Sequence, residues 1–98
     1  MSNGLSVAVV GATGAVGGEF LRLFEERNFP VRELRLLASE RSVGKRLAFR
    51  GCDVKIGLAS PDAFSGVDVA FFSAGASRSR EMVPAALEAG ALVVDNSS

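Results

Sequence analysis

Short apolar runs alternate with amphipathic and polar stretches along this chain of 98 residues. The first run, Leu5–Val10, is rich in valine and indicates a buried strand. From residue 15 to about residue 27, apolar side chains recur among charged ones at the spacing of an amphipathic helix. Asn28-Phe-Pro30 ends that helix, because proline lacks an N–H group and restricts the residue before it. A second apolar run at residues 34–38 completes a strand, helix and strand unit.

Polar and alternating segments follow the second apolar run. Residues 39–46 are polar and contain Gly44, which predicts a loop at the carboxyl end of the second strand, beside the turn after the first. Residues 47–50 and 53–56 alternate apolar and polar side chains around Gly51, which predicts a small hairpin or an irregular strand pair. Such an insertion is unusual in the simplest nucleotide-binding folds.

The last part of the chain returns to helical and apolar segments. Ser60 and Pro61 suit the cap and the first position of a short helix that ends near Phe64. A strand is expected at residues 67–72 and another at residues 91–94. Between them we expect a helix that is capped by Ser77, runs to Glu88 and is closed by Gly90. Pro84 implies that this helix bends or starts late. This order predicts an α/β fold, a Rossmann-like, doubly wound, mostly parallel sheet with helices on both faces.

Three glycines stand where the first strand gives way to the first helix. Gly11, Gly14 and Gly17 follow Val7-Ala-Val-Val at three-residue spacing. Gly11 and Gly14 let the backbone turn tightly and approach a pyrophosphate, and Gly17 lets the helix pack close to the strand. The N–H groups at the start of that helix favour an anion. The spacing is a variant of the commoner Gly-x-Gly-x-x-Gly, and an ordinary glycine-rich turn is the alternative.

The loop after the second strand bears on the choice between NAD and NADP. An NAD site usually places an acidic residue there to hold the ribose hydroxyls, whereas an NADP site places an arginine near the 2′-phosphate. Ser39 stands at the strand end and is followed by Arg41 and Ser42, a guanidinium and a hydroxyl that favour NADP. Glu40 would weaken or reverse that preference if it faced the ribose. A solvated charged loop is the alternative for Glu40, Arg41 and Lys45.

Two further segments follow expected strands at the same edge of the sheet. Ser73, Ala74 and Gly75 are small, so the backbone there can pass close to the flat faces of a cofactor, although small residues also occur wherever a strand enters a helix. Asp95 begins the last four residues, which all carry hydrogen-bonding side chains and for which turn formation is the alternative explanation.

Composition limits the remaining chemistry. With 98 residues, 48% of them apolar and 22% charged, we expect a single folded domain over residues 1–98. Eleven basic and eleven acidic residues cancel, which argues against a general affinity for nucleic acid or an anionic membrane. The first apolar run is far shorter than the roughly 20 residues of a membrane span, and no basic leader precedes it, so we expect a cytoplasmic protein.

The single cysteine is a weak candidate for chemistry. Cys52 lies in the expected hairpin, and the chain contains no histidine to activate it. One cysteine excludes an internal disulfide, and without histidine a structural zinc site is not expected either. A small buried or turn cysteine is the better interpretation, and no catalytic residue is assigned.

Five segments follow one another in order along essentially the whole chain: Val-Ala-Val-Val-Gly-Ala-Thr-Gly-Ala-Val-Gly, Leu-Ala-Ser-Glu-Arg-Ser-Val-Gly-Lys, Leu-Ala-Phe-Arg-Gly, Phe-Phe-Ser-Ala-Gly-Ala-Ser and Val-Val-Asp-Asn-Ser-Ser. Taken together, they resemble aspartate-semialdehyde dehydrogenases. Many enzymes share the glycine motif, but the combination is much more specific. The resemblance implies the N-terminal NADP-binding domain of an enzyme that reduces L-4-aspartyl phosphate to L-aspartate 4-semialdehyde with NADPH and releases phosphate. That reaction leads to lysine, threonine, methionine and, in bacteria, diaminopimelate.

The resemblance also implies roles for individual residues. The pyrophosphate would be bound by Thr13, Gly14, Ala15 and Val16, and the adenosine 2′-phosphate by Arg41 and Ser42. The middle of the cofactor would lie against Ser73, Ala74 and Gly75, and the nicotinamide would be approached by Asn96, Ser97 and Ser98. The cysteine nucleophile, histidine acid/base and substrate-binding arginines of that family would follow Ser98. We therefore expect an excised cofactor-binding domain without dehydrogenase activity, from a parent that forms homo-oligomers largely through the absent domain.

Two other classes of function stay open at this stage. An extended short-chain reductase, or an enzyme like N-acetylglutamyl-phosphate reductase, carries a similar glycine motif. A Tyr-x-x-x-Lys pair further along would favour the short-chain reductase, and a cysteine in an Asn-Cys context would favour the semialdehyde dehydrogenase. The other class is a non-catalytic module that senses the redox state of NADP through a partner, although no segment marks a partner surface.

Overall fold

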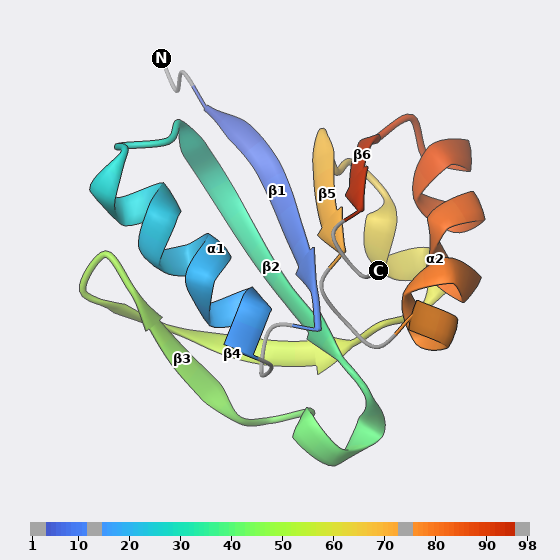
Figure 1. The fold of residues 1–98 in the computed structure, drawn as a ribbon, viewed down its shortest axis with the longest axis horizontal. Coiled ribbons are helices and arrows are strands. Elements are labelled where there is room, and N and C mark those ends of the chain that lie inside the picture. Colours follow the sequence, from blue (N-terminus) through green and yellow to red (C-terminus); the bar gives the residue numbers. More distant parts are fainter. Residues whose placement is uncertain (1–3, 12–14, 73–75, 96–98) are drawn as a thin grey trace.

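One sheet organises the part of the chain that the structure, a computed structural model, describes: residues 4–11, 15–72 and 76–95. Its six described strands lie in the order β3-β4-β2-β1-β5-β6 (Figure 1). The elements in chain order are β1 (Leu5–Val10), α1 (Ala15–Glu26), β2 (Val31–Ala38), the 3-10 helix η1 (Glu40–Ser42), β3 (Arg46–Phe49), β4 (Cys52–Leu58), the 3-10 helix η2 (Pro61–Phe64), β5 (Val69–Phe72), α2 (Ala76–Glu88) and β6 (Leu92–Asp95).

The strand directions confirm the predicted fold class. β2 and β5 flank β1 in parallel, β4 lies parallel to β2, and β6 lies parallel to β5. Only β3, among the described strands, is antiparallel, and it pairs with β4. The sheet is therefore mostly parallel and Rossmann-like, as the alternation of elements predicted.

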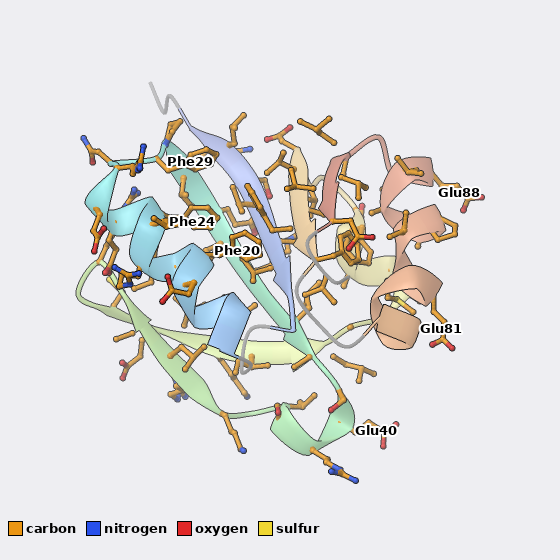
Figure 2. All side chains as sticks on the ribbon, viewed as in Figure 1. Phe20, Phe24, Phe29, Glu40, Glu81 and Glu88 are labelled. Atoms are coloured by element: carbon orange, nitrogen blue, oxygen red, sulfur yellow. The ribbon has the colours of Figure 1, made fainter. Side chains whose placement is uncertain are left out.

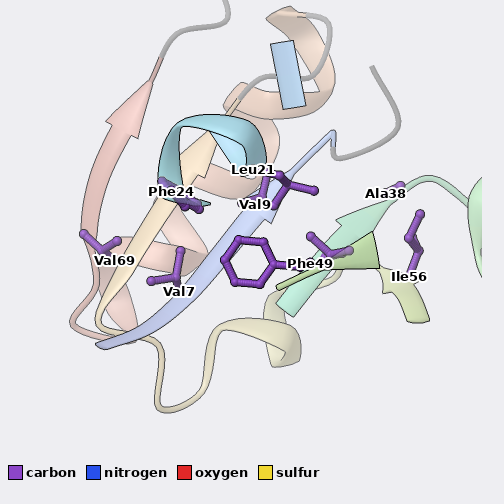
Figure 3. Close-up of a cluster of buried hydrophobic side chains, with 9 residues drawn as sticks. Val7, Val9, Leu21, Phe24, Ala38, Phe49, Ile56 and Val69 are labelled. Carbon is purple, nitrogen blue, oxygen red and sulfur yellow. The ribbon is translucent and has the colours of Figure 1, made fainter. Parts of the chain in front are cut away.

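Helix α1 covers one face of the sheet. Val7 and Val9 of β1 point to this face and pack with Phe24 of α1 in one buried cluster (Figure 3). Figure 2 shows Phe20, Phe24 and Phe29 along the sheet side of α1 and the turn that follows it. The Phe24 ring lies 5.0 Å, between centroids, from the ring of Phe29. Burial of each such side chain contributes about 1.5–3 kcal/mol, so this cluster holds α1 on the sheet.

Helices α2 and η2 cover the opposite face. Because strand side chains alternate between faces, Ala8 and Val10 point away from α1 and pack with Phe64 of η2 and Ala86 of α2. The rings of Phe64 and Phe72 are stacked, with centroids 5.9 Å apart. The two faces of β1 are thus both buried, which explains its continuous apolar sequence.

The predicted hairpin is present, and its second strand is longer than predicted and also belongs to the parallel sheet. β4 extends to Leu58 and joins the parallel sheet, with Leu36 of β2 opposite Ile56. The connection from β2 to β4 contains η1 and β3 in place of the α-helix of the simplest nucleotide folds. Phe49 of β3 is buried against α1, its ring edge-on to that of Phe24. The hairpin therefore covers part of the α1 face.

Arg50 attaches the tip of this hairpin to the end of α1. Its φ of 52° is unusual for a residue other than glycine. Its backbone N–H donates to the Glu25 carboxylate at 2.6 Å, and its guanidinium donates to the carbonyls of Phe24 and Phe29. The guanidinium carbon also lies 4.9 Å from the centre of the Phe49 ring. One side chain thus binds a carbonyl in the last turn of α1 and another just after it, and it fixes the hairpin there.

Several expected boundaries differ from the structure, and the end of α2 is confirmed. β5 begins at Val69 rather than residue 67, and β6 covers Leu92–Asp95 rather than residues 91–94. β2 begins at Val31 rather than residue 34. Its first residues pair with β1 through the backbone, and the exposed charged side chains of Arg32 and Glu33 conceal the strand pattern. α2 begins at Ala76, so Ser77 lies inside the helix and Pro84 does not mark a late start. Ser60 has the extended backbone of a cap but makes no capping side-chain hydrogen bond. Gly90, with a φ of 89°, closes α2 as predicted.

Candidate functional site

The carboxyl ends of five parallel strands lie side by side along one edge of the sheet. The paired residues near these ends are Leu58 with Ala38, Leu37 with Val10, Val10 with Phe72, and Phe72 with Asp95. Each segment that carries predicted site residues leaves one of these strand ends. Ligands of open α/β sheets bind in the crevice outside such ends. The topology therefore places the described residues from which the predicted segments depart at one edge.

The backbone turns sharply where β1 ends. Gly11 has a φ of 84°, which favours glycine, and its N–H donates to the carbonyl of Leu37 at 2.8 Å. Helix α1 starts at Ala15, soon after this turn, and includes Val16. The first N–H groups of an α-helix have no partner within the helix, and with the helix dipole they favour an anion. This arrangement suits a pyrophosphate at the start of α1.

Helix η1 shapes the loop after β2. The carbonyl of Ser39 accepts the N–H of Ser42 at 2.9 Å. The loop is also attached to β4, because the Gly44 N–H donates to the Ile56 carbonyl at 2.9 Å and the Ile56 N–H donates to the Lys45 carbonyl at 2.8 Å. The position of η1 is thus set by a strand from the hairpin as well as by β2.

The side chains of this loop differ in their exposure. Glu40 and Arg41 are exposed, Ser39 is half-buried, and Ser42 is buried with 8% of its surface accessible. Figure 2 shows Glu40 on the outer side of the loop. Among the described residues, none forms an ion pair or a side-chain hydrogen bond with the Arg41 guanidinium. Arg41 is therefore a cation of this loop that is available to an anionic ligand, and Lys45, also exposed, is a second one.

The end of β4 is also part of this edge, which was not predicted from the sequence. The Ala59 N–H donates to the Ala38 carbonyl at 2.9 Å, directly beside Ser39. Leu58 lies at the same end and is 44% exposed. The apolar residues after Lys55, followed by Ser-Pro, were the available signal that this strand continues beyond the hairpin.

Several predicted site residues lie outside the described part of the chain. They are Thr13, Gly14, Ser73, Ala74, Gly75, Asn96, Ser97 and Ser98. The structure describes the residues from which two of these segments depart: Phe72, fully buried at the end of β5, and Asp95, exposed at the end of β6. Their roles stay predictions.

Cys52 is placed at the other edge of the sheet. It is exposed and is the first residue of β4, so it lies at the amino end of a strand that runs parallel to β2. Within the described residues, no three His, Cys, Asp or Glu side chains gather as a metal site would require. None of the described helices has the length and apolar character needed to cross a membrane.

A polar network lies at the amino ends of the parallel strands, here called the amino edge, opposite the carboxyl edge formed by their carboxyl ends. Ser6 is fully buried, its hydroxyl donates to the Glu33 carboxylate at 2.8 Å, and its N–H donates to the Asp68 carboxylate at 2.8 Å. The Ser6 hydroxyl, together with Arg35, holds the pKa of Glu33 below its usual value, and partial burial opposes this shift. These contacts link β1 to β2 and to the start of β5.

Comparison with known proteins identifies the family. A family model described as "Semialdehyde dehydrogenase, NAD binding domain" matches residues 6–98. The chain belongs to this family. Aspartate-semialdehyde dehydrogenase of Bacillus subtilis is 50% identical over 98 residues, which are 100% of this chain and 28% of that protein. The enzyme of Aquifex aeolicus is 53% identical over 96 residues, 97% of this chain and 28% of that protein.

Solved structures of semialdehyde dehydrogenases show the same fold. Aspartate semialdehyde dehydrogenase II of Vibrio cholerae, crystallised in complex with ASA, superposes with a TM-score of 0.92 at 48% identity, over 98% of this chain and 32% of that one. The Candida albicans enzyme, crystallised with NADP, gives a TM-score of 0.78 at 28% identity, over 98% of this chain and 30% of that one. The chain thus spans about a third of these structures, and it is the nicotinamide dinucleotide-binding domain of this oxidoreductase family.

Proposed function

We propose that the carboxyl edge of the sheet binds NADP(H) and that Arg41 holds the adenosine 2′-phosphate. The observation that carries this proposal is an exposed guanidinium, without a partner among the described residues, on the loop after β2. A guanidinium binds a phosphate through two parallel charge-assisted hydrogen bonds, whereas the ribose hydroxyls of NAD need a carboxylate at this position. The NADP named with the Candida albicans structure agrees with this choice.

The residues present fit the rest of the dinucleotide. The positive φ of Gly11 and the start of α1 at Ala15 suit a pyrophosphate over the helix N-terminus. We assign the pyrophosphate to Thr13, Gly14, Ala15 and Val16, the adenosine side to Ser39, Arg41 and Ser42, the middle of the cofactor to Ser73, Ala74 and Gly75, and the nicotinamide side to Asn96, Ser97 and Ser98.

The parent protein, in this proposal, is a cytoplasmic, homo-oligomeric aspartate-semialdehyde dehydrogenase that reduces L-4-aspartyl phosphate in the biosynthesis of lysine, threonine, methionine and diaminopimelate. Bound NADPH supplies the hydride for that reduction. The chain contains no histidine, and its one cysteine lies at the edge opposite the strand ends, so the nucleophile and the base of the family reaction are not among these residues. We expect no turnover of aspartate semialdehyde by this chain alone.

Calorimetric titration with NADP and NAD tests the proposal. For Arg41→Ala we expect the Kd for NADP to rise about 10- to 100-fold, the loss of a charge-assisted pair, and the Kd for NAD to change little. Arg27→Ala is the matched control, because Arg27 is exposed at the far end of α1. Equal binding of both nucleotides by the unaltered chain, unchanged in Arg41→Ala, would contradict the 2′-phosphate assignment.

A further inference from the structure

Two cations lie directly opposite each other in the hairpin. Arg46 of β3 pairs with Lys55 of β4, and both side chains are exposed. Directly opposite residues in an antiparallel pair have Cβ atoms only about 4.5–5.5 Å apart, and like charges there are destabilising. Neither cation forms an ion pair with any described residue, and Asp53 stands opposite Ala48, one diagonal step away. The hairpin thus retains an unfavourable pair that any neutral residue would relieve.

The pair belongs to a positive region beside the proposed phosphate loop. Lys45 precedes β3 and is fixed to β4 through its carbonyl, and Arg41 lies in η1 just before it. Residues 39–58 carry five basic and two acidic side chains, although the whole chain has eleven of each. Arg50, one of these five, binds the end of α1 and so does not belong to the region. We call Arg41, Lys45, Arg46 and Lys55 the basic hairpin.

The face on which the pair stands is open to solvent. Leu47 and Phe49 pack toward α1, so the alternation of strand side chains places Arg46 and Lys55 on the other face. No described residue of β3 or β4 belongs to the core cluster under α2 and η2. The charges therefore stand outside the part of that face which the helices cover, and their field extends into solvent.

We propose that Arg46 and Lys55 steer NADP(H) electrostatically toward the carboxyl edge and add to its selection over NAD(H). This proposal rests on the proposed function of that edge. The 2′-phosphate gives NADP about one and a half to two more negative charges than NAD, so the same field attracts it more strongly. Such fields act over about 10 Å at 0.1 M salt and raise association rates by about 10- to 1,000-fold in strongly charged clefts. The pair accelerates encounter without touching the nucleotide.

The association rate constant is the quantity to measure. The chain has no tryptophan or tyrosine, so the emission of the reduced nicotinamide itself is followed after rapid mixing with the intact chain. For the double variant Arg46→Gln with Lys55→Gln, we expect a threefold to tenfold slower association of NADPH at low salt, a smaller change for NADH and a nearly unchanged dissociation rate. Added salt should remove the difference.

The matched control removes the same charge at the other edge. Arg27→Gln with Arg32→Gln alters the end of α1 and the start of β2, where Arg32 has only a 3.8 Å exposed contact to Asp68. If this control slows association as much as the hairpin variant, net charge alone is responsible and the steering proposal fails. It also fails if the hairpin variant associates at the unaltered rate while Arg41→Ala weakens NADPH binding. If the folded chain binds neither nucleotide, both proposals fail.

Thermal melting gives a readout that does not depend on nucleotide. Because the cation pair opposes folding, we expect the hairpin variant to melt about 1–6 °C higher than the unaltered chain at low salt, with a smaller difference at high salt. A lower melting temperature would show that the pair stabilises the hairpin. It would contradict the argument that Arg46 and Lys55 destabilise the folded chain.

Discussion

The two edges of the sheet use polar residues in opposite ways. At the amino edge, the buried Ser6 donates hydrogen bonds to the Glu33 carboxylate of β2 and to the Asp68 carboxylate just before β5, and these contacts fix both neighbouring strands to β1. At the carboxyl edge, the four cations of the basic hairpin, Arg41 among them, are exposed and form no ion pairs with the described residues. A polar group that has its partner within the fold contributes to stability, and one that lacks it is available to a ligand.

The largest stability effect is expected at the amino edge. Asp68→Ala would leave the buried Ser6 N–H without the carboxylate that it now reaches at 2.8 Å. An unsatisfied buried donor costs about 1–3 kcal/mol, so we expect the free energy of unfolding in urea to fall by that amount. Asp68→Asn retains an acceptor and should lose less. The comparison between edges breaks down if Asp68→Ala is as stable as the unaltered chain, or if NADP affinity falls in a variant that is still folded.

A smaller, pH-dependent effect is expected from Glu33. Its pKa is lowered in the folded chain, chiefly by the Ser6 hydroxyl, so its contribution is fully present above the pKa of the unfolded chain and is lost as pH falls through the folded value. Acid titration of stability should show a decline in the pH range below the usual glutamate pKa. Glu33→Gln, which keeps an acceptor without the charge, should flatten that part of the curve; an unchanged curve would remove Glu33 as its source.

The smallest stability effect is expected at the carboxyl edge. Arg41→Ala removes an exposed side chain with no ion pair among the described residues, so the unfolding free energy should stay within about 0.5 kcal/mol of the unaltered chain. Urea denaturation of this variant, measured alongside the nucleotide titrations, separates an effect of Arg41 on stability from its effect on binding. A loss comparable with that of Asp68→Ala would mean that Arg41 has a structural role, and the contrast between the edges would have to be withdrawn.

The sequence was sufficient where a local pattern coincides with burial. β1 and α1 were predicted because Val7, Val9 and Phe24 are apolar at the spacing of the element that buries them. The start of β2 was missed because Arg32 and Glu33 are exposed at the amino edge, where charged residues replace the apolar signal. Local pattern reports which side chains are buried, and it is weakest at the margins of the sheet.

The sequence predicted which segments of the candidate site follow strand ends, but not how the side chains of the η1 loop and the hairpin are arranged. The alternation of elements placed Gly11 and Ser39 at neighbouring strand ends, and the register of β1 with β2 confirms this. The burial of Ser42 and the opposition of Arg46 to Lys55 depend on how η1 folds and how β3 aligns with β4. These are tertiary properties that no spacing in the sequence specifies.

The hydrogen bonds that Arg50 makes with the end of α1 link the carboxyl edge of the sheet to the opposite end of the molecule. The η1 loop is bonded to β4, β4 continues through the hairpin, and the hairpin tip is held on α1. A ligand that binds only the folded chain stabilises everything that unfolds together, by RT ln(1 + [L]/Kd). Amide exchange at the hairpin tip should therefore become slower when a ligand binds at the distant carboxyl edge. Through these hydrogen bonds, the tip of the hairpin reports binding that takes place at the other end of the molecule.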